Sequence, residues 1–389
     1  MKQNNIQIPE GYKNSSLGII PNDWEVKRLG EVCSTFKSGY SITSKNIFET
    51  GIYPVYGGNG LRGYTSTYTH DGEYILIGRQ GALCGNITYC IGKQYISEHA
   101  IAVQAEKNNS LKFLIYKLDF WNLNRFSESS AQPGLSVEKL IRYKLALPPL
   151  PQQQKIAEIL GAWDEAIEKQ NTLIDKLTER KRGLMQQLLT GKKRLAGFNE
   201  DWKEVRLGEM FKERNETNIN NLPLLSITAN KGVIYQADSE KKDNSNEDKS
   251  KYKRICKGDI GYNTMRMWQG RSALSNLDGI ISPAYTVVIP KTKSNALFFS
   301  YLFKMPIVIN NFWRHSQGLV SDTLNCKFKD FKLVKVFIPC YIEQTAIANI
   351  LTAADKEIEL ATSKLELLRN QKSGLMQQLL TGKTRVKID

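Results

Sequence analysis

Apolar residues recur at alternating spacings of four and three in two long stretches, which begin at Ile156 and Ile347. This spacing places the apolar side chains on one face of a helix, whereas a strand would alternate every second residue. A series held this long is typical of a coiled-coil seam. The seams comprise Ile156, Leu160, Trp163, Ile167, Ile174, Leu177, Leu184 and Leu188, and Ile347, Leu351, Ile358, Leu365, Leu368, Leu375 and Leu379.

Proline and glycine indicate where both helices begin and end. The segments LPPLPQQQ (147–154) and IPCYIEQ (338–344) precede them, and proline is tolerated in a first helical turn. Gly191 and Gly382 follow the last leucines, where a left-handed residue commonly ends a helix. Neither helix can bury its seam alone, so we expect the two to pack together as an antiparallel coiled coil.

The chain contains an internal repeat. GLMQQLLTGK occurs at 183–192 and again at 374–383, an offset of 191 residues from Gly183 to Gly374. A second repeated segment lies near the start of each half: DWEVKRLGEV begins at Asp23 and DWKEVRLGEM begins at Asp201. The plan is therefore two unlike units, each followed by a nearly identical helix.

This plan predicts an α+β fold in which two mixed α/β, strand-rich recognition domains alternate with the long helices in a pseudo-two-fold repeat. The expected boundaries are 1–147 and 196–338 for the two domains, and 148–195 and 339–389 for the helical regions. The polar stretch 236–254 contains few apolar residues and is expected to be a solvated loop.

The two strand-rich units share a skeleton. Residues 53–69, YPVYGGNGLRGYTSTYT, predict strands joined by a glycine turn. GEYILIGRQG (72–81) matches GDIGYNTMRMWQG (258–270), with the Arg, Gln and Gly of each placed in correspondence. SEHAIAVQ (97–104) and SPAYTVVIP (282–290) predict a further strand in each unit.

Charge narrows the possible partners. The chain has 54 Lys and Arg against 39 Asp and Glu, a net charge of +15, which favours a polyanionic partner or an anionic membrane surface over a merely basic surface. No apolar run is long enough to span a membrane, and the first residues lack the apolar core of a signal peptide. Six cysteines without a CxxC pair predict a reducing, cytoplasmic setting.

Polar and basic residues on loops of both units are candidates for contacting DNA. Arg and Lys read guanine, Asn and Gln read adenine, and hydroxyl groups join basic side chains on phosphates. Each candidate taken singly has the alternative of being an ordinary turn or surface residue. The candidates are Asn59, Arg62, Arg79, Gln80, Ser129, Ser130 and Gln132 in the first unit, and Asn263, Arg266, Arg271, Arg314, His315, Gln317 and Ser321 in the second.

Catalytic motifs are missing from the sequence. Gly382, Lys383 and Thr384 do not make a phosphate-binding loop, because a helix precedes them and the required first glycine is Gln377. The Pro148-Pro149 pair lies between leucines and lacks the Asn or Asp of an adenine methyltransferase loop. Histidine and cysteine spacings give no metal site. We therefore expect a chain without catalytic residues or a metal.

The pattern resembles the DNA specificity subunit of type I restriction–modification systems. The segment LPPLPQQQKIAEILGAWD and the repeated LLTGK helix ends carry the resemblance, which runs from Asp23 to Lys383. The second copy departs from it at IPCYIEQTAIANILTAAD, where the Pro-Leu-Pro-Gln run is lost.

The resemblance implies that each unit binds one half of a bipartite, asymmetric DNA target and that the helices set the spacer between the halves. Two modification (methyltransferase) subunits would dock on the helices, and restriction (translocase and nuclease) subunits would complete the complex. S-adenosylmethionine, ATP and Mg²⁺ would be bound by those partners. Residues kept in both repeats beyond what packing requires are candidates for docking: Met185, Gln186, Gln187, Met376, Gln377 and Gln378.

Two alternatives remain. A DNA-modifying enzyme acting alone would need the missing catalytic motifs. A coiled-coil scaffold that does not bind DNA would not need the basic surplus.

Overall fold

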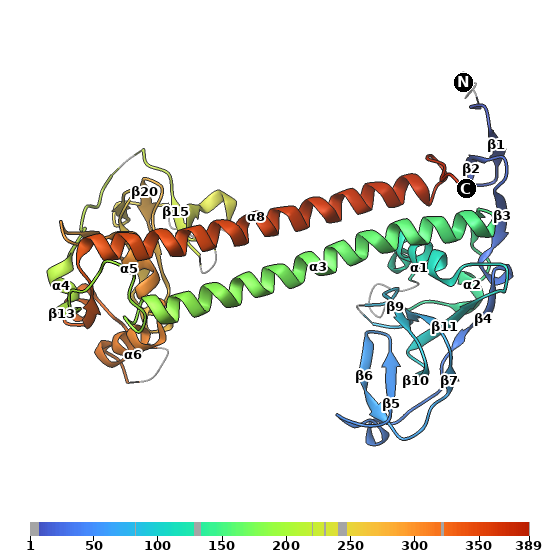
Figure 1. The fold of residues 1–389 in the computed structure, drawn as a ribbon, viewed down its shortest axis with the longest axis horizontal. Coiled ribbons are helices and arrows are strands. Elements are labelled where there is room, and N and C mark those ends of the chain that lie inside the picture. Colours follow the sequence, from blue (N-terminus) through green and yellow to red (C-terminus); the bar gives the residue numbers. More distant parts are fainter. Residues whose placement is uncertain are drawn as a thin grey trace. The chain divides into compact units, whose positions relative to one another are not determined.

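The computed structural model describes residues 8–81, 83–127, 134–219, 221–228, 231–239, 247–319 and 323–388. The chain divides into two compact units. Unit 1 comprises Met1–Asn171 with Ser363–Asp389, and unit 2 comprises Thr172–Thr362. Two 39-residue helices, α3 (Leu150–Leu188) and α8 (Tyr341–Leu379), each contribute one part to either unit (Figure 1).

Unit 1 is built mainly from short antiparallel strands. One four-stranded sheet has the order β4-β11-β8-β9 and another the order β6-β5-β10-β7, in which β10 and β5 are parallel. The strands are β1 (Tyr12–Ser15), β2 (Gly18–Pro21), β3 (Glu25–Arg28), β4 (Cys33–Ser38), β5 (Tyr53–Gly57), β6 (Gly60–Thr65), β7 (His70–Asp71), β8 (Tyr74–Gly78), β9 (Ile87–Cys90), β10 (Lys93–Ile96), β11 (Ala100–Ala105) and β12 (Lys144–Leu147). The short helices are η1 (Leu29–Glu31), η2 (Ser44–Asn46), α1 (Leu111–Phe120), η3 (Leu123–Phe126) and α2 (Val137–Leu140).

Unit 2 repeats the central sheet with the order β14-β21-β18-β19. Its strands are β13 (Lys203–Arg206), β14 (Phe211–Glu213), β15 (Leu225–Ile227), β16 (Val233–Tyr235), β17 (Lys253–Ile255), β18 (Ile260–Asn263), β19 (Ser272–Leu274), β20 (Gly279–Ile281), β21 (Tyr285–Pro290) and β22 (Lys335–Ile338). Its helices are α4 (Leu207–Met210), η4 (Gln236–Asp238), η5 (Met267–Gln269), α5 (Ala296–Leu302), α6 (Pro306–His315) and α7 (Phe328–Phe331).

The internal repeat is therefore present in the fold as well as in the sequence. The central sheets share one strand order, and the DW segments form equivalent pairs, β3 with β12 and β13 with β22. The hairpin expected at 53–69 forms as β5 and β6. A helix follows β11 and β21 alike, and its side chains join the core with the long helices.

The long helices run antiparallel within each unit. In unit 1, Ile156 and Leu160 of α3 share a core with Leu379 of α8 and Leu380 just after it. Further along, Asp164 pairs with Lys372, so the numbering rises along one helix and falls along the other. Unit 2 has the same direction, with Leu188 of α3 and Ile347 of α8 in one core.

All fifteen apolar residues named for the seams are buried or half-buried. Lys181 and Lys372 interrupt the apolar series. Each forms an ion pair with an aspartate of the other helix, Lys181 with Asp355 and Lys372 with Asp164. A charged pair in a seam restricts the register in which two helices can pack.

Both helices end as expected. Gly191 and Gly382 have φ of 68° and 74°, the left-handed conformation that glycine adopts without strain. A Cβ at Gly382 would lie 2.7 Å from Pro21 and 3.3 Å from Trp24, and one at Gly191 would lie 3.4 Å from Trp202. The tryptophan of each DW segment thus packs on the glycine that ends a long helix.

The starts of the long helices and the two ends of the expected loop differ from expectation. The helices begin at Leu150 and Tyr341, inside the proline-containing segments rather than after them, with Pro151 in the first turn where its missing N–H costs nothing. The expected loop 236–254 contains η4 at its start and the first residues of β17 at its end, where Lys253 and Arg254 pair with β20. Pairing with a buried strand overrides their polar character.

Candidate nucleic-acid interface

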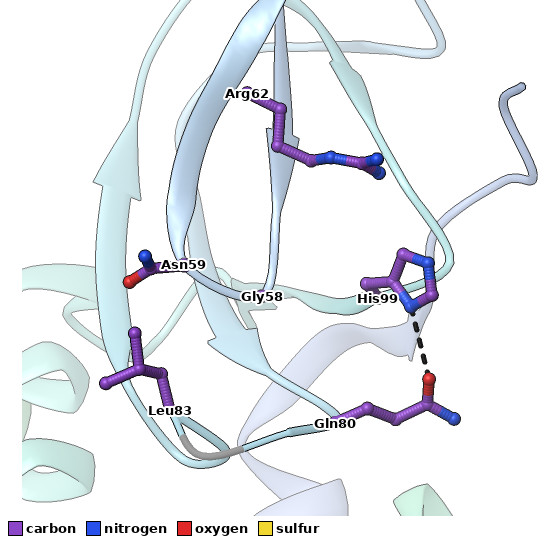
Figure 2. Close-up of a pocket in the computed structure, with 6 residues that line it drawn as sticks. All are labelled: Gly58, Asn59, Arg62, Gln80, Leu83 and His99. Atoms are coloured by element: carbon purple, nitrogen blue, oxygen red, sulfur yellow. Dashed lines mark hydrogen bonds between the residues drawn. The ribbon is translucent and has the colours of Figure 1, made fainter. Parts of the chain in front are cut away.

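An open pocket of about 350 Å³ lies on unit 1, and half of its six lining residues were expected to contact DNA. Asn59 and Arg62 come from the β5–β6 hairpin and Gln80 from the segment after β8, and the three meet there (Figure 2). All three side chains are exposed. Its lining residues are Gly58, Asn59, Arg62, Gln80, Leu83 and His99.

The two sheets of unit 1 bring these residues together. Gly58 and Asn59 form the turn between β5 and β6, and Gln80 follows β8. Two glycines allow the close approach, because a Cβ at Gly58 would lie 2.9 Å from the carbonyl oxygen of His99 and one at Gly78 would overlap the carbonyl oxygen of Gly58. Larger residues would push the turn away from β8.

His99 belongs to the pocket but was not among the sequence candidates. It immediately precedes β11, and its Nδ1 lies 3.1 Å from Oε1 of Gln80 (Figure 2). Its ring is therefore placed to hold the Gln80 amide. No local motif around His99 pointed to a role, and only the pairing of β8 with β11 brings it beside Gln80.

Arg79 is half-buried, and its main chain is bonded to two other segments. Its N–H donates to the carbonyl of His99 at 2.9 Å, and its carbonyl accepts from the N–H of Leu135 at 2.9 Å. These bonds fix the main chain on which the next residue, Gln80, is displayed.

The same backbone pattern identifies the corresponding positions in unit 2. Thr264 N–H donates to the carbonyl of Ala284 at 3.2 Å, and the Thr264 carbonyl accepts from Cys326 N–H at 2.8 Å. Strand register agrees, because Gly78 pairs with Ala100 and Asn263 pairs with Tyr285. Thr264 therefore corresponds to Arg79.

The expected alignment of the Arg, Gln and Gly in the two units is consequently wrong. Arg266 lies two residues beyond the position that corresponds to Arg79, and Gln269 lies in η5. The residue that corresponds to Gln80 is Met265, which is 48% exposed. Unit 2 makes an Asx turn here, in which Asn263 Oδ1 accepts from Met265 N–H at 3.0 Å, and η5 is inserted after it.

The remaining candidates of unit 2 fall into two groups. Arg266, Arg271, Arg314 and Gln317 are exposed. Asn263 is used in its own turn, and Nδ1 of His315 lies 2.8 Å from the Asn311 carbonyl oxygen, near the end of α6. Four candidates lie outside the described residues: Ser129, Ser130, Gln132 and Ser321.

Each recognition domain is bonded to the helix pair of its own unit through a tyrosine. In unit 1, Tyr116 of α1 donates to Asp164 Oδ2 at 2.7 Å, and Lys372 Nζ lies 5.2 Å from the Tyr116 ring centre. Burial and the adjacent carboxylate raise the pKa of the Tyr116 hydroxyl above its usual value, so it remains a proton donor. Tyr301 makes the equivalent bond to Asp355 in unit 2, at 2.6 Å.

The repeated helix ends present glutamines and bury methionines. Gln186, Gln187, Gln377 and Gln378 are exposed. Met376 is only 8% exposed and lies in the core of unit 1, and Met185 packs against the core of unit 2. Packing explains why both repeats keep a methionine at this position. Met376 is therefore too buried to contact a partner, and Met185 is only partly exposed.

Neither a metal cluster nor a membrane span is found in the part of the chain that the structure describes. Its His, Cys, Asp and Glu residues form no group of three or more that could hold a metal ion. None of its helices is long and apolar enough to cross a membrane.

Comparison with known proteins places the chain in a family. A sequence model described as type I restriction modification DNA specificity domain matches residues 21–179 and 199–370, well over half of the chain. The specificity subunit of the Escherichia coli type I restriction enzyme EcoprrI is 40% identical over 174 residues, 43% of this chain and 41% of that protein. The putative MjaX specificity subunit of Methanocaldococcus jannaschii is 27% identical over 97% of both chains.

Solved structures share the fold at low sequence identity. An S subunit from a type I restriction–modification system of M. genitalium has a TM-score of 0.60 at 15% identity, covering 94% of this chain and 97% of that one. The HsdS subunit of Thermoanaerobacter tengcongensis has a TM-score of 0.50 at 16% identity, covering 96% and 100%. From the extent of the family match, this chain belongs to the type I restriction–modification DNA specificity family.

Proposed function

We propose that this chain is the sequence-specific DNA-binding specificity subunit of a type I restriction–modification complex, with each unit reading one half of a bipartite, asymmetric target. One observation carries the proposal: the two units share a backbone frame but display different side chains at equivalent positions. Gln80 in unit 1 corresponds to Met265 in unit 2. Two units with the same backbone arrangement and different exposed side chains are suited to binding two different half-sites.

The side chains in the unit 1 pocket suit reading of base edges. Arg62 can donate two hydrogen bonds to guanine, and Asn59 or Gln80 can pair with adenine. The chain's net charge of +15 provides attraction to the phosphates, which carries no sequence information but supplies much of the affinity. Two half-sites read by linked domains multiply specificity, because binding of the second is intramolecular.

The long helices would set the spacer between half-sites and dock two modification subunits. Their exposed glutamines, Gln186 and Gln187 in one repeat and Gln377 and Gln378 in the other, give two copies of one surface for two copies of one partner. We propose that those partners bind S-adenosylmethionine and methylate a flipped-out adenine, and that restriction subunits bind ATP and Mg²⁺. This chain would bind no cofactor and act with its partners in the cytoplasm.

Relatives are named as specificity subunits, and we accordingly assign no catalytic step to this chain. Its part in methylation would be to hold the complex in register on the DNA while a modification subunit extracts the base. The enzyme alternative has no motif in its favour. The scaffold alternative is disfavoured by the basic surplus and by the gathering of Asn59, Arg62 and Gln80 at one pocket.

A salt titration separates DNA binding from a scaffold role. The complex of this chain with its modification subunits should bind a labelled duplex carrying the target, and six to ten phosphate contacts should reduce affinity about 10³-fold or more between 50 and 200 mM salt. Fluorescence anisotropy measures this slope. Absence of binding at low salt, or an affinity that does not change with salt, would leave only the scaffold alternative.

A further inference from the structure

Two pairs of side chains occupy equivalent positions on the two units and differ in chemistry. Gln80 and His99 of unit 1 correspond to Met265 and Ala284 of unit 2 by backbone hydrogen bonds and strand register. Gln80, Met265 and Ala284 are exposed, and His99 is half-buried. At one place on the shared frame, unit 1 therefore presents a polar pair and unit 2 an apolar pair.

The His99 ring orients the Gln80 amide. With the proton on Nδ1, His99 donates to Gln80 Oε1, which lies 3.1 Å away (Figure 2). The carboxamide would otherwise rotate freely about its last bond and offer its oxygen and nitrogen in either order. The bond leaves one lone pair of Oε1 and both Nε2 protons available in a fixed order.

An amide held in this way distinguishes adenine from guanine. Adenine presents an N6 donor beside an N7 acceptor in the major groove, which match the glutamine oxygen and nitrogen. Guanine presents two acceptors, O6 and N7. One of them would face the acceptor Oε1, and no hydrogen bond could form between the two atoms. A freely rotating amide would also have one mismatched contact on guanine. It could, however, turn its oxygen toward other donors, and its preference for adenine would then be weaker.

We propose that Gln80, oriented by His99, reads an adenine in the half-site of unit 1, and that Met265 with Ala284 packs on a thymine methyl group at the equivalent position of the other half-site. This inference rests on the proposed DNA-binding function and deepens it by naming specificity-determining residues. Apolar side chains recognise thymine through its C5-methyl group, which no other base carries in the groove. Gln80 contacts the base, and His99 acts through Gln80 as a positioning residue.

Duplex-binding measurements on the complex with its modification subunits test the proposal. The wild-type target is first defined by methylome sequencing, and every base pair of both half-sites is then replaced singly. We expect wild type to prefer adenine over guanine about tenfold or more at one position of the unit 1 half-site. Gln80→Met should reduce that preference to less than about threefold and leave the unit 2 half-site unchanged.

Two further variants separate reading from positioning. His99→Ala should reduce the adenine-to-guanine ratio at the same position while affinity for the adenine duplex falls much less. Met265→Gln combined with Ala284→His should move the preference at the equivalent unit 2 position from thymine toward adenine. This gain in unit 2 does not depend on how well the unit 1 variants fold.

Gln154 supplies a matched control, because it is an exposed glutamine of the same unit on α3, away from the pocket. Gln154→Met should leave every base preference unchanged. Unchanged preferences in Gln80→Met, or an equal loss on every duplex by a folded Gln80→Met complex, would overturn the inference. A wild-type complex that binds all duplexes equally would overturn the proposed function itself, and the two failures are thereby distinguished.

Discussion

The Lys372 ammonium donates to Oδ1 of Asp164 at 2.5 Å and so joins the end of α8 to the beginning of α3 within unit 1. The Lys372 side chain is only 16% exposed, and the Tyr116 hydroxyl occupies the other oxygen of the carboxylate. Lys181, Asp355 and Tyr301 repeat the arrangement in unit 2. One polar cluster thus fixes helix register and recognition-domain attachment together.

Loss of the Asp164 carboxylate should destabilise unit 1. Asp164→Ala leaves Lys372 partly buried without its partner, and we expect a loss of about 1 kcal/mol in the free energy of unfolding, small because Asp164 is about half exposed. Urea denaturation followed by circular dichroism measures the change. The control is Glu165→Ala, which removes a solvent-exposed pair with Lys169 and should cost much less. Equal losses in the two variants would contradict a register role.

Exchange of the two charges should restore most of the stability. Asp164→Lys alone places two ammonium groups together in the seam, whereas Asp164→Lys with Lys372→Asp recreates an opposite pair. A double-mutant cycle measures the coupling, which we expect to be on the order of 1 kcal/mol. Additive effects of the two substitutions would show that the side chains do not interact.

Lys117 should make stability depend on alkaline pH. It is 5% exposed and donates to the Leu380 carbonyl at 2.6 Å, and burial lowers the pKa of its ammonium to about 8. Below pH 8 the group is protonated in both the folded and the unfolded chain. Between pH 8 and about 10.5 the unfolded chain binds more protons, so the contribution of Lys117 to the free energy of unfolding should rise with pH.

Replacement by leucine isolates this effect, because the equivalent residue of α5 in unit 2 is the buried Leu302. As pH rises from 8 to 10.5, the unfolding free energy of wild type should gain up to about 3 kcal/mol relative to Lys117→Leu. Chemical denaturation across that range gives both values. A constant difference would mean that Lys117 keeps its ordinary pKa in the folded chain.

Thiol labelling should distinguish buried from partly exposed cysteines. Burial raises the pKa of Cys33, Cys90 and Cys326 to about 12, which leaves almost no thiolate at neutral pH. Cys256 and Cys340 are only partly buried. At pH 7.5 we expect iodoacetamide to modify Cys256 and Cys340 first in the native protein and all six cysteines after denaturation, as read by peptide mass spectrometry. Rapid labelling of Cys33 or Cys326 would contradict the packing of their cores.

Features with a long sequence period were predictable from the chain alone. The seam from Ile156 to Leu188 repeats over many turns, and burial in the structure follows it residue by residue. The two copies of GLMQQLLTGK established the repeat, and Gly191 and Gly382 located the helix ends. Each of these depends on local backbone geometry or on a face that must be buried.

Features that depend on strand register were not predictable. His99 reaches Gln80 only because β11 pairs with β8 in one register, and no local motif encodes that pairing. The correspondence of Met265 with Gln80 was missed because η5 is inserted after Met265. In the sequence alone, Arg266 matches Arg79 as the same residue type, and this match suggested another alignment. Met376 was expected to contact a partner because both repeats hold methionine at its position. Its side chain lies in the core instead, and the sequence does not show that burial.

Methylome sequencing of the host, with this gene intact and deleted, tests the central claim most directly. The account predicts one bipartite, asymmetric motif that carries methyladenine in the intact strain and loses it on deletion. Restoring the gene with Gln80→Met should return methylation with a relaxed base in one half-site only. With the modification genes present and expressed, a methylome that does not change on deletion would contradict the assignment of this chain as a specificity subunit.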